Sequence, residues 1–467
     1  MGEKVKFPSM ELIKKYDKRG SFYTDYPALG LWEQGFSDKQ YREALNELVE
    51  SGENLPIFFY LHFPYCPKQC FYCMCFSEIT ASHEKINEFL DNLGKEIDML
   101  KDFFYKKGYK PLFKKVHLGG GSPSMMNEEE FKIMQNHLKK IIDFDKVEEY
   151  AIEVDPRHTS PEKMIFYHKM GIDRISLGVQ EFDLEVQKAI NRVQPVETIE
   201  KIMTPEIRKY FKSFNFDIIY GLPRQTRESF RKTMENVIRL SPDRLGVCIL
   251  GWRPDIFKHQ KLIYQEELPS LEESNLMNFD AVQMLTDAGY ERIGIDHFAK
   301  PTENLAVTKK QGKLHRSAMG YNPGDYIEMV GLGHSGMNRI LNYYFQREYS
   351  LEKYYAALNE GKFPIFRGYK LSKDQEIRRD IMEKIICYDK VDFKEIEEKY
   401  GVNFKEYFKI DLGALKELIE DGIVKVYENH LEITPIGTFF HRHVCAAFDE
   451  LLRRGSGYKH ARDTADL

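Results

Sequence analysis

The 467-residue sequence lacks a long apolar run. We find no stretch near the ~18 consecutive apolar residues that a membrane-spanning helix needs. Its start, MGEKVKFPSM, has neither the apolar core of a signal peptide nor the Ser or Thr of a myristoylation motif. These absences argue against membrane insertion and secretion, and we expect a cytoplasmic protein.

An excess of positive charge is also missing. The chain has 68 Lys and Arg against 73 Asp and Glu, a net charge of −5. A protein whose affinity comes from phosphate contacts carries a basic surplus, so nucleic acid is not the expected partner. The sequence has no repeat or low-complexity segment, and its 42% hydrophobic content can supply the cores of more than one domain.

Cysteine is scarce and unevenly distributed. Of the seven cysteines, Cys248, Cys387 and Cys445 stand far apart. The other four fall within ten residues, at positions 66, 70, 73 and 75. In a reducing compartment, such clustering predicts metal or redox chemistry and not a disulfide framework.

Short β-rich runs alternate with helical segments from residue 57 onward. The runs begin at residues 57, 114, 148, 174, 214, 244 and 292. Between them, segments such as 83–104 show the apolar spacing of a helix. This alternation predicts βαβ units and a parallel sheet, and six or seven units suit a complete or partial β/α barrel of TIM type.

Changes of pattern along the chain predict three parts. Residues 1–50 show no sustained period and are expected to form an N-terminal arm, followed by the barrel at 51–365. Residues 366–467 are expected to form a small, mostly helical domain, with two charged helices and a hairpin in a winged-helix-like order. DNA binding by this domain is the alternative to a lid, but its helices carry as much acid as base, which favours the lid.

Three cysteines follow the first predicted strand at the spacing CxxxCxxC: Cys66, Cys70 and Cys73. One loop of this kind can surround three corners of a [4Fe–4S] cluster and leave the fourth iron open to S-adenosylmethionine (SAM). An electron from the cluster would then cleave SAM to a 5′-deoxyadenosyl radical. A structural zinc site using Cys75 or His62 is the alternative, but such sites usually need a second CxxC-type pair, which the sequence lacks.

Glycines and polar residues stand at the carboxyl ends of the later predicted strands. In a β/α barrel these ends form the face on which active sites are built. Their shared placement therefore favours a ligand site over separate roles as capping or solvent-facing residues. The residues are Gly120, Gly121, Ser122, Glu153, Gln180, Asp217 and Gly251.

These motifs resemble the radical SAM superfamily and, within it, the oxygen-independent coproporphyrinogen III oxidase (dehydrogenase) family. The resemblance runs from about residue 12 to 453 and includes HFPYCPKQCFYCMC at 62, SLGVQEFD at 176 and DIIYGLPRQT at 217. It implies a barrel of radical SAM type and one cluster bound by Cys66, Cys70 and Cys73, with Cys75 as a cysteine that does not ligate. It also implies SAM contacts, at two SAM-related positions, from Tyr60, Tyr72, Gly120, Gly121, Ser122, Glu153, Gln180, Arg192, Asp217, Gly251 and Met337.

The resemblance implies a reaction on the propionates of a tetrapyrrole. The radical would remove a hydrogen atom from the β-carbon of a propionate, and the substrate radical would lose CO2 and one electron to become a vinyl group. Two propionates of coproporphyrinogen III would react in this way, giving protoporphyrinogen IX in anaerobic haem biosynthesis. An external electron donor such as flavodoxin or ferredoxin, and an electron acceptor, are the further partners implied.

The chain departs from the family's usual residues where a second SAM or the substrate would lie. Trp252, Arg253 and His334 replace other residue types, and an indole face with a guanidinium suits a tetrapyrrole that carries four propionates. We therefore expect these three residues to contact substrate. Core packing of Trp252 and solvation of Arg253 is the alternative.

Two other functions remain open at this point. A radical SAM methyltransferase could act on another tetrapyrrole or aromatic substrate with the same radical site. A haem-binding chaperone of the superfamily would bind haem without turnover, but such relatives generally lack the Cys-x-Cys ending that Cys75 supplies.

Overall fold

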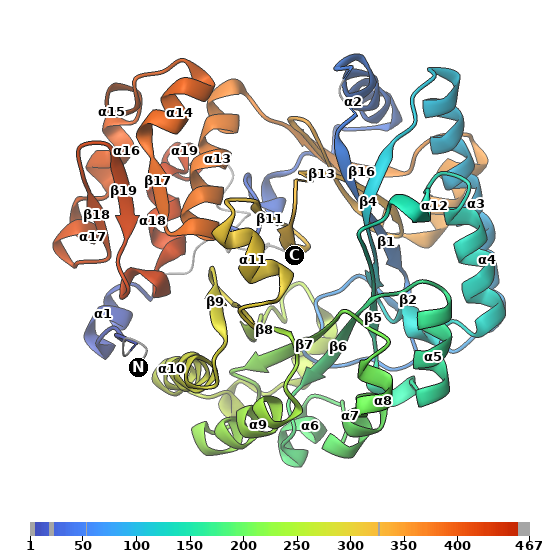
Figure 1. Ribbon diagram of the computed structural model, residues 1–467, viewed down its shortest axis with the longest axis horizontal. Helices are drawn as coiled ribbons and strands as arrows, with labels where there is room; N and C mark the ends of the chain where they lie inside the picture. The colour runs from blue at the N-terminus through green and yellow to red at the C-terminus, as the bar shows by residue number, and fades with distance from the viewer. Residues whose placement is uncertain (1–4, 18–22, 53, 326, 456–467) are drawn as a thin grey trace.

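The computed structural model describes residues 5–17, 23–52, 54–325 and 327–455, and its centre is a curved sheet (Figure 1). The sheet has twelve strands in the order β16-β15-β14-β13-β1-β4-β5-β6-β7-β8-β10-β9. Neighbouring strands from β13 to β8 are parallel, whereas pairs outside that block are antiparallel. The parallel strands are β13 (Glu328–Gly333), β1 (Pro56–Phe63), β4 (Leu112–Gly120), β5 (Glu149–Val154), β6 (Arg174–Gln180), β7 (Ser213–Tyr220) and β8 (Arg244–Ile249).

The antiparallel strands lie at the two edges of this sheet, so the barrel is partial. One edge continues from β13 through β14 (Met337–Ile340), β15 (Tyr343–Arg347) and β16 (Ile365–Lys370). The other continues from β8 through β10 (His297–Ala299) to β9 (Glu291–Ile293). The expectation of a partial β/α barrel is therefore confirmed.

Six of the seven predicted strands are parallel members of the barrel, but the seventh is not. The run at 292 forms β9, a short edge strand antiparallel to β10. The parallel strand β13 was not predicted, because its sequence EMVGLG is glycine-rich and lacks the β-branched run that marks a strand.

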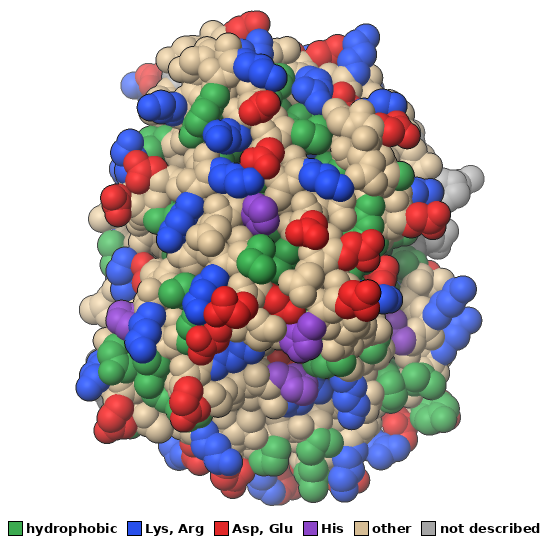
Figure 2. Space-filling view, turned by 90° about the vertical axis from the view of Figure 1, so that its right-hand side faces the viewer, with side chains coloured by type: hydrophobic (Ala, Val, Ile, Leu, Met, Phe, Trp, Pro, Cys, Tyr) green, Lys and Arg blue, Asp and Glu red, His purple; other side chains and the backbone are tan. Residues whose placement is uncertain are grey.

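Helices cover the outer face of the parallel strands (Figure 1). The longest is α3, whose Ile86, Phe89, Leu93, Ile97 and Leu100 recur at helical spacing and are fully buried. Charged side chains of both signs are interspersed on the face seen in Figure 2. The covering helices include α3 (His83–Lys106), α4 (Glu128–Leu138), α5 (Pro161–Lys169), α9 (Arg227–Leu240) and α10 (Leu271–Asp287).

The N-terminal region contains helical structure that the sequence did not predict. Helices α1 (Met10–Lys15) and α2 (Asp38–Glu50) lie within it, and α2 begins with a capping box between Ser37 and Gln40. Tyr41, Leu45 and Leu48 of α2 are fully buried in the barrel's core. The expectation that these first residues lack a sustained period is therefore wrong for α2.

The predicted helices and hairpin of the C-terminal region are confirmed. A sheet ordered β17-β19-β18 lies against helices. Its hydrophobic core continues into the N-terminal region, through Ile13 and Tyr16, and into the adjoining edge of the barrel, through Phe279 and Ile293. No helix in the described part of the chain is long and apolar enough to cross a membrane. The elements are α13 (Lys373–Tyr388), β17 (Lys390–Asp392), α14 (Phe393–Tyr400), α15 (Phe404–Tyr407), α16 (Lys409–Ala414), α17 (Lys416–Glu420), β18 (Val424–Val426), β19 (His430–Ile433), α18 (His441–Phe448) and α19 (Glu450–Arg453).

Candidate active site

The cysteine loop leaves the end of β1 and is fixed by backbone contacts. The Ser122 N–H donates to the Tyr65 carbonyl at 2.8 Å, and the Phe71 N–H donates to the Ile190 carbonyl at 3.0 Å. A Cβ at Gly121 would lie only 2.5 Å from the Tyr65 carbonyl oxygen. A glycine is therefore required where the loop after β4 passes the cysteine loop.

Cys66, Cys70 and Cys73 all line one cavity of about 290 Å³. Each is a free thiol. Over the described ranges, no group of three His, Cys, Asp or Glu side chains is placed to hold a single metal ion. A [4Fe–4S] cluster instead takes each thiolate on a different iron, so three thiols around a common cavity fit such a cluster.

Two arginines approach the sulfur of Cys70. The Sγ atom lies 3.6 Å from Arg192 Nη1 and 3.7 Å from Arg157 Nη2. Both guanidiniums also contact Asp155, at 3.5 Å and 2.6 Å. Burial raises the pKa of Asp155, but the two arginines outweigh burial and lower it to about 2. The two guanidiniums therefore bring positive charge to the thiolate side of the cavity.

The sequence analysis predicted Arg192 but missed Arg157 and Asp155. Both follow β5 directly in the segment IEVDPR, which begins at residue 152. Their position directly after a barrel strand, two and four residues beyond Glu153, could have identified them.

Cys73 and Cys75 contact each other within the loop. The Cys75 N–H donates to Cys73 Sγ at 3.4 Å. A bond from the Cys75 thiol, more than any other group, lowers the pKa of Cys73. Burial raises the pKa of Cys66 to about 12. The protein alone thus favours the thiolate at Cys73 and opposes it at Cys66.

Glu153, at the end of β5, is held by bonds to both carboxylate oxygens. Oε1 lies 2.9 Å from His117 Nε2, and Oε2 accepts from the Gly120 N–H at 3.2 Å. His117 Nδ1 lies 3.0 Å from Arg174 Nη2, so Nδ1 is the acceptor and Nε2 carries the proton. Burial opposes ionisation of Glu153, but the bond from His117 keeps its pKa below its usual value.

Asp217 on β7 faces the same cavity as Glu153. It accepts from Asn215 Nδ2 at 2.9 Å and from Ser176 Oγ at 3.2 Å. Burial is the largest influence and raises the pKa of Asp217. A buried carboxylate with only neutral donors gains from a cationic ligand.

Most of the predicted SAM contacts meet at this cavity. Three of them do not line it: Tyr60, Gly251 and Met337. The Tyr60 hydroxyl is 3.0 Å from His62 Nδ1, and its ring stacks on His117 behind the cavity. The predicted SAM contacts that do line it are Tyr72, Gly120, Gly121, Ser122, Glu153, Gln180, Arg192 and Asp217.

Comparison with known proteins shows similarity over nearly the whole chain. The family model of the Radical SAM superfamily matches residues 60–237, and that of the HemN C-terminal domain matches 371–440. The oxygen-independent coproporphyrinogen III oxidase of Salmonella typhimurium is 35% identical over 95% of this chain and 96% of its own length. This chain belongs to the oxygen-independent coproporphyrinogen III oxidase family.

Two further relatives agree with this assignment. The enzyme of that name from Escherichia coli is 34% identical over 95% of this chain and 96% of its own length. The solved structure of coproporphyrinogen III oxidase from the same organism, described as a radical SAM enzyme, is 33% identical with a TM-score of 0.88. It matches 96% of this chain and 100% of that one.

In this member of the coproporphyrinogen III oxidase family, the three residues expected to contact substrate do not line the cysteine cavity. Trp252 donates from Nε1 to the Gln260 carbonyl at 3.4 Å, and Arg253 pairs with Asp255 at 3.1 Å. His334 is 2% exposed and faces the His62 ring at 5.8 Å between centroids. None of the three lines a second, neighbouring cavity either.

Gly251 and Met74 line a second cavity, beside the first. Met74 lies in the cysteine loop between Cys73 and Cys75, and a Cβ at Gly251 would lie 2.4 Å from Met74 Cε. Met337, in contrast, lies on β14 and packs against Phe58 and Tyr60 in the barrel interior. The predicted SAM contacts thus fall into two neighbouring spaces and one apolar cluster.

Proposed function

We propose that this chain catalyses the oxygen-independent oxidative decarboxylation of two propionates of coproporphyrinogen III to vinyl groups, giving protoporphyrinogen IX. The observation that carries the proposal is a cysteine cavity of radical SAM type in a chain similar over 95% of its length to enzymes named for this substrate. The protein would act in the cytoplasm.

The cysteine cavity offers partners for a cluster and for SAM. Cys66, Cys70 and Cys73 would bind a [4Fe–4S] cluster, which together with SAM supplies the electron and the 5′-deoxyadenosyl radical. Glu153 and Asp217 offer acceptors to the ammonium and hydroxyl groups of SAM. Arg192, Gln180 and Ser122 offer donors to its carboxylate and to polar edges of the nucleoside.

The remaining duties of the protein are to place the propionate carbon and to exclude other hydrogen donors. No acid–base pair is required, because the carboxylate leaves as CO2 while one electron passes to an acceptor. Each cycle therefore takes one electron in and releases one. We infer an external one-electron donor such as flavodoxin or ferredoxin and a separate acceptor.

Anaerobic turnover of coproporphyrinogen III with mass detection tests the proposed function. We expect product that has lost CO2 and two hydrogen atoms at each of two propionates. A product heavier by a methylene group would instead indicate a methyltransferase. Tight haem binding without SAM cleavage would indicate a chaperone.

Removing a strand-end carboxylate is expected to weaken SAM binding before it alters the cluster. Replacing Glu153 or Asp217 by Ala deletes a charged hydrogen-bond acceptor worth about 1.5 to 3 kcal/mol, or roughly tenfold to a hundredfold in the dissociation constant of SAM. Titration of SAM into reconstituted protein measures the loss, with iron content as the internal reference. Glu148→Ala, an exposed carboxylate one residue before β5, is the matched control. Unchanged affinity in both variants would mean that SAM does not bind at these strand ends.

A further inference from the structure

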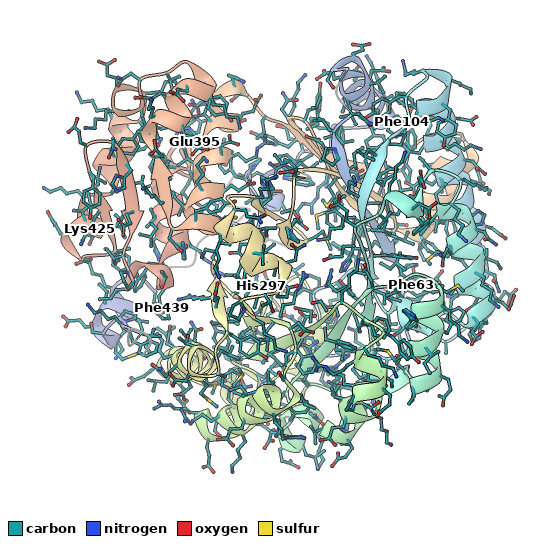
Figure 3. All side chains as sticks on the ribbon, in the orientation of Figure 1. Phe63, Phe104, His297, Glu395, Lys425 and Phe439 are labelled. Atoms are coloured by element: carbon teal, nitrogen blue, oxygen red, sulfur yellow. The ribbon has the colours of Figure 1, made fainter. Side chains whose placement is uncertain are left out.

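A second cavity of about 440 Å³ lies between the barrel and the C-terminal domain. Its walls come from the end of β8, from the turn between β9 and β10, and from residues 438–443, with Tyr16 of the N-terminal region at its margin. In Figure 3, His297 lies near the centre of the molecule and Phe439 at the foot of the C-terminal domain. Both line this cavity.

This cavity adjoins the cysteine cavity on two sides. Met74, between two of the clustered cysteines, forms part of its wall. On the inner side His297 lines both this cavity and a small polar space that includes Asp217 and Glu153. A Cβ at Gly246 would lie 3.3 Å from Asp217 Oδ1 and 3.7 Å from His297 Nε2. The glycine therefore leaves the space between the two residues open.

The cavity has a small excess of positive charge, with three arginines against two aspartates. Its lining includes Arg292, Arg316 and Arg442, against Asp17 and Asp296 as the acidic members. Asp296 is already paired, with Arg316 at 3.1 Å and with His297 at 2.7 Å. The cavity as a whole thus favours an anionic ligand.

Arg292 has no ion pair among the described residues, unlike Arg316 in the same cavity. Its Nη atoms donate to Thr438 Oγ1 at 2.9 Å and to the carbonyls of Thr438 and Ile295 at 3.1 and 3.2 Å. Its Nε is buried without a hydrogen-bond partner, and the guanidinium lies 4.6 Å from the centre of the Phe439 ring. Arg316 and Arg253, in contrast, each contact a carboxylate.

A guanidinium held in a partly buried site without a counter-ion has an unfavourable solvation free energy. Burial is the main reason that the pKa of Arg292 lies below its ordinary value. An incoming carboxylate offsets this cost by forming charge-assisted hydrogen bonds. The Phe439 ring and the Thr438 acceptors fix the orientation of the guanidinium in advance.

We propose that this cavity receives the tetrapyrrole and that Arg292 binds one of its propionate carboxylates. The inference rests on the proposed function. Aromatic side chains around the cavity, among them Tyr220, Phe439 and Phe440, offer faces to pyrrole rings. The proposed substrate site is therefore the interface between the barrel and the C-terminal domain, and not the surroundings of Trp252 and Arg253.

Steady-state kinetics of Arg292→Ala with coproporphyrinogen III tests this position. We expect KM for the substrate to rise by about tenfold to a hundredfold, because a charge-assisted contact is lost. Iron content and the SAM cleavage seen without substrate should stay at wild-type levels. Arg292→Lys keeps the charge but loses the planar guanidinium, so its KM should lie between those of the wild-type and Arg292→Ala proteins.

Arg227→Ala is the matched control, since Arg227 pairs with Asp280 on the outer helices. It should leave KM unchanged. A tetramethyl ester of the substrate, which carries no carboxylate, should bind wild-type and Arg292→Ala protein equally in equilibrium titrations.

The outcomes separate this inference from the proposed function. If wild-type protein decarboxylates coproporphyrinogen III but neither Arg292 variant changes KM, the cavity assignment is overturned and the function stands. If wild-type protein cleaves SAM but releases no CO2, the proposed function fails, and Arg292 is then tested by equilibrium binding of coproporphyrinogen III alone. Equal binding by wild-type and Arg292→Ala proteins would overturn the assignment in that case too.

Discussion

Replacing any one of Cys66, Cys70 and Cys73 by Ala is expected to reduce SAM cleavage and product formation to background. All three thiols line one cavity, and each would bind a different iron of the cluster, so no other cysteine ligand can replace a lost one. Loss of one leaves a second iron without a protein ligand. Iron content, the visible absorbance of the cluster and anaerobic SAM cleavage together measure the effect.

Cys75→Ala is the control for this set, because Cys75 lies on the same loop and lines the same cavity. We expect it to keep its iron, while product formation falls to a smaller extent through the lost bond to Cys73. An iron content as low as that of the other variants would make Cys75 a ligand and the site one of another type. Full activity in any of the three other variants would falsify the cluster assignment.

Arg347→Met is expected to lower the free energy of unfolding by about 3 to 5 kcal/mol, because it leaves a buried charge without its partner. Arg347 Nε lies 2.8 Å from Glu96 Oε1, and both side chains are 0% exposed. Glu96 Oε2 also accepts from the Gly333 N–H at 2.9 Å and from the Tyr354 hydroxyl at 2.5 Å. The pair thus joins α3 to the end of β13 and to β15.

Urea unfolding followed by circular dichroism measures this loss. Lys362→Met breaks a surface pair with Glu360 at a similar distance, 2.8 Å, and should cost less than about 1 kcal/mol. Removing both buried charges together, as Glu96→Gln with Arg347→Met, should be milder than removing Arg347 alone, since no unpaired charge remains and the amide oxygen still accepts from Gly333 and Tyr354. A single variant no less stable than the surface control would show that the buried pair contributes little.

The barrel strands could be predicted because their pattern is local. Each of the six parallel strands found from sequence is a short β-rich run between helical segments, and this alternation is visible without any tertiary information. β13 was not predicted because its sequence is rich in glycine, although its backbone pairs with β1 along the strand. Helix α2 was missed although Tyr41, Ala44, Leu45 and Leu48 recur at helical spacing, because the aromatic-rich segment before it obscured the period.

The sequence could predict those parts of the candidate site whose residues are neighbours in the chain or stand at the carboxyl ends of strands. The cysteine loop is contiguous, and Glu153 and Asp217 belong to strands whose carboxyl ends meet. The bond from His117 to Glu153 depends on the pairing of β4 with β5, which no spacing reveals. The surroundings of Arg292 likewise depend on the docking of the C-terminal domain, since Thr438 lies 146 positions away along the chain.

Met74 makes the cysteine loop part of the wall of the second cavity. This residue stands between Cys73 and Cys75, yet its side chain forms a wall of the domain-interface cavity. The loop is fixed on that side by His259, which contacts the Cys73 carbonyl at 2.6 Å, and by Gln260, which donates to the Tyr72 carbonyl at 2.9 Å. The cysteine loop therefore belongs to both cavities, because its cysteines line one and Met74 lines the other. A displacement of the loop backbone at Cys73 would move a cluster ligand and a wall residue of the second cavity together.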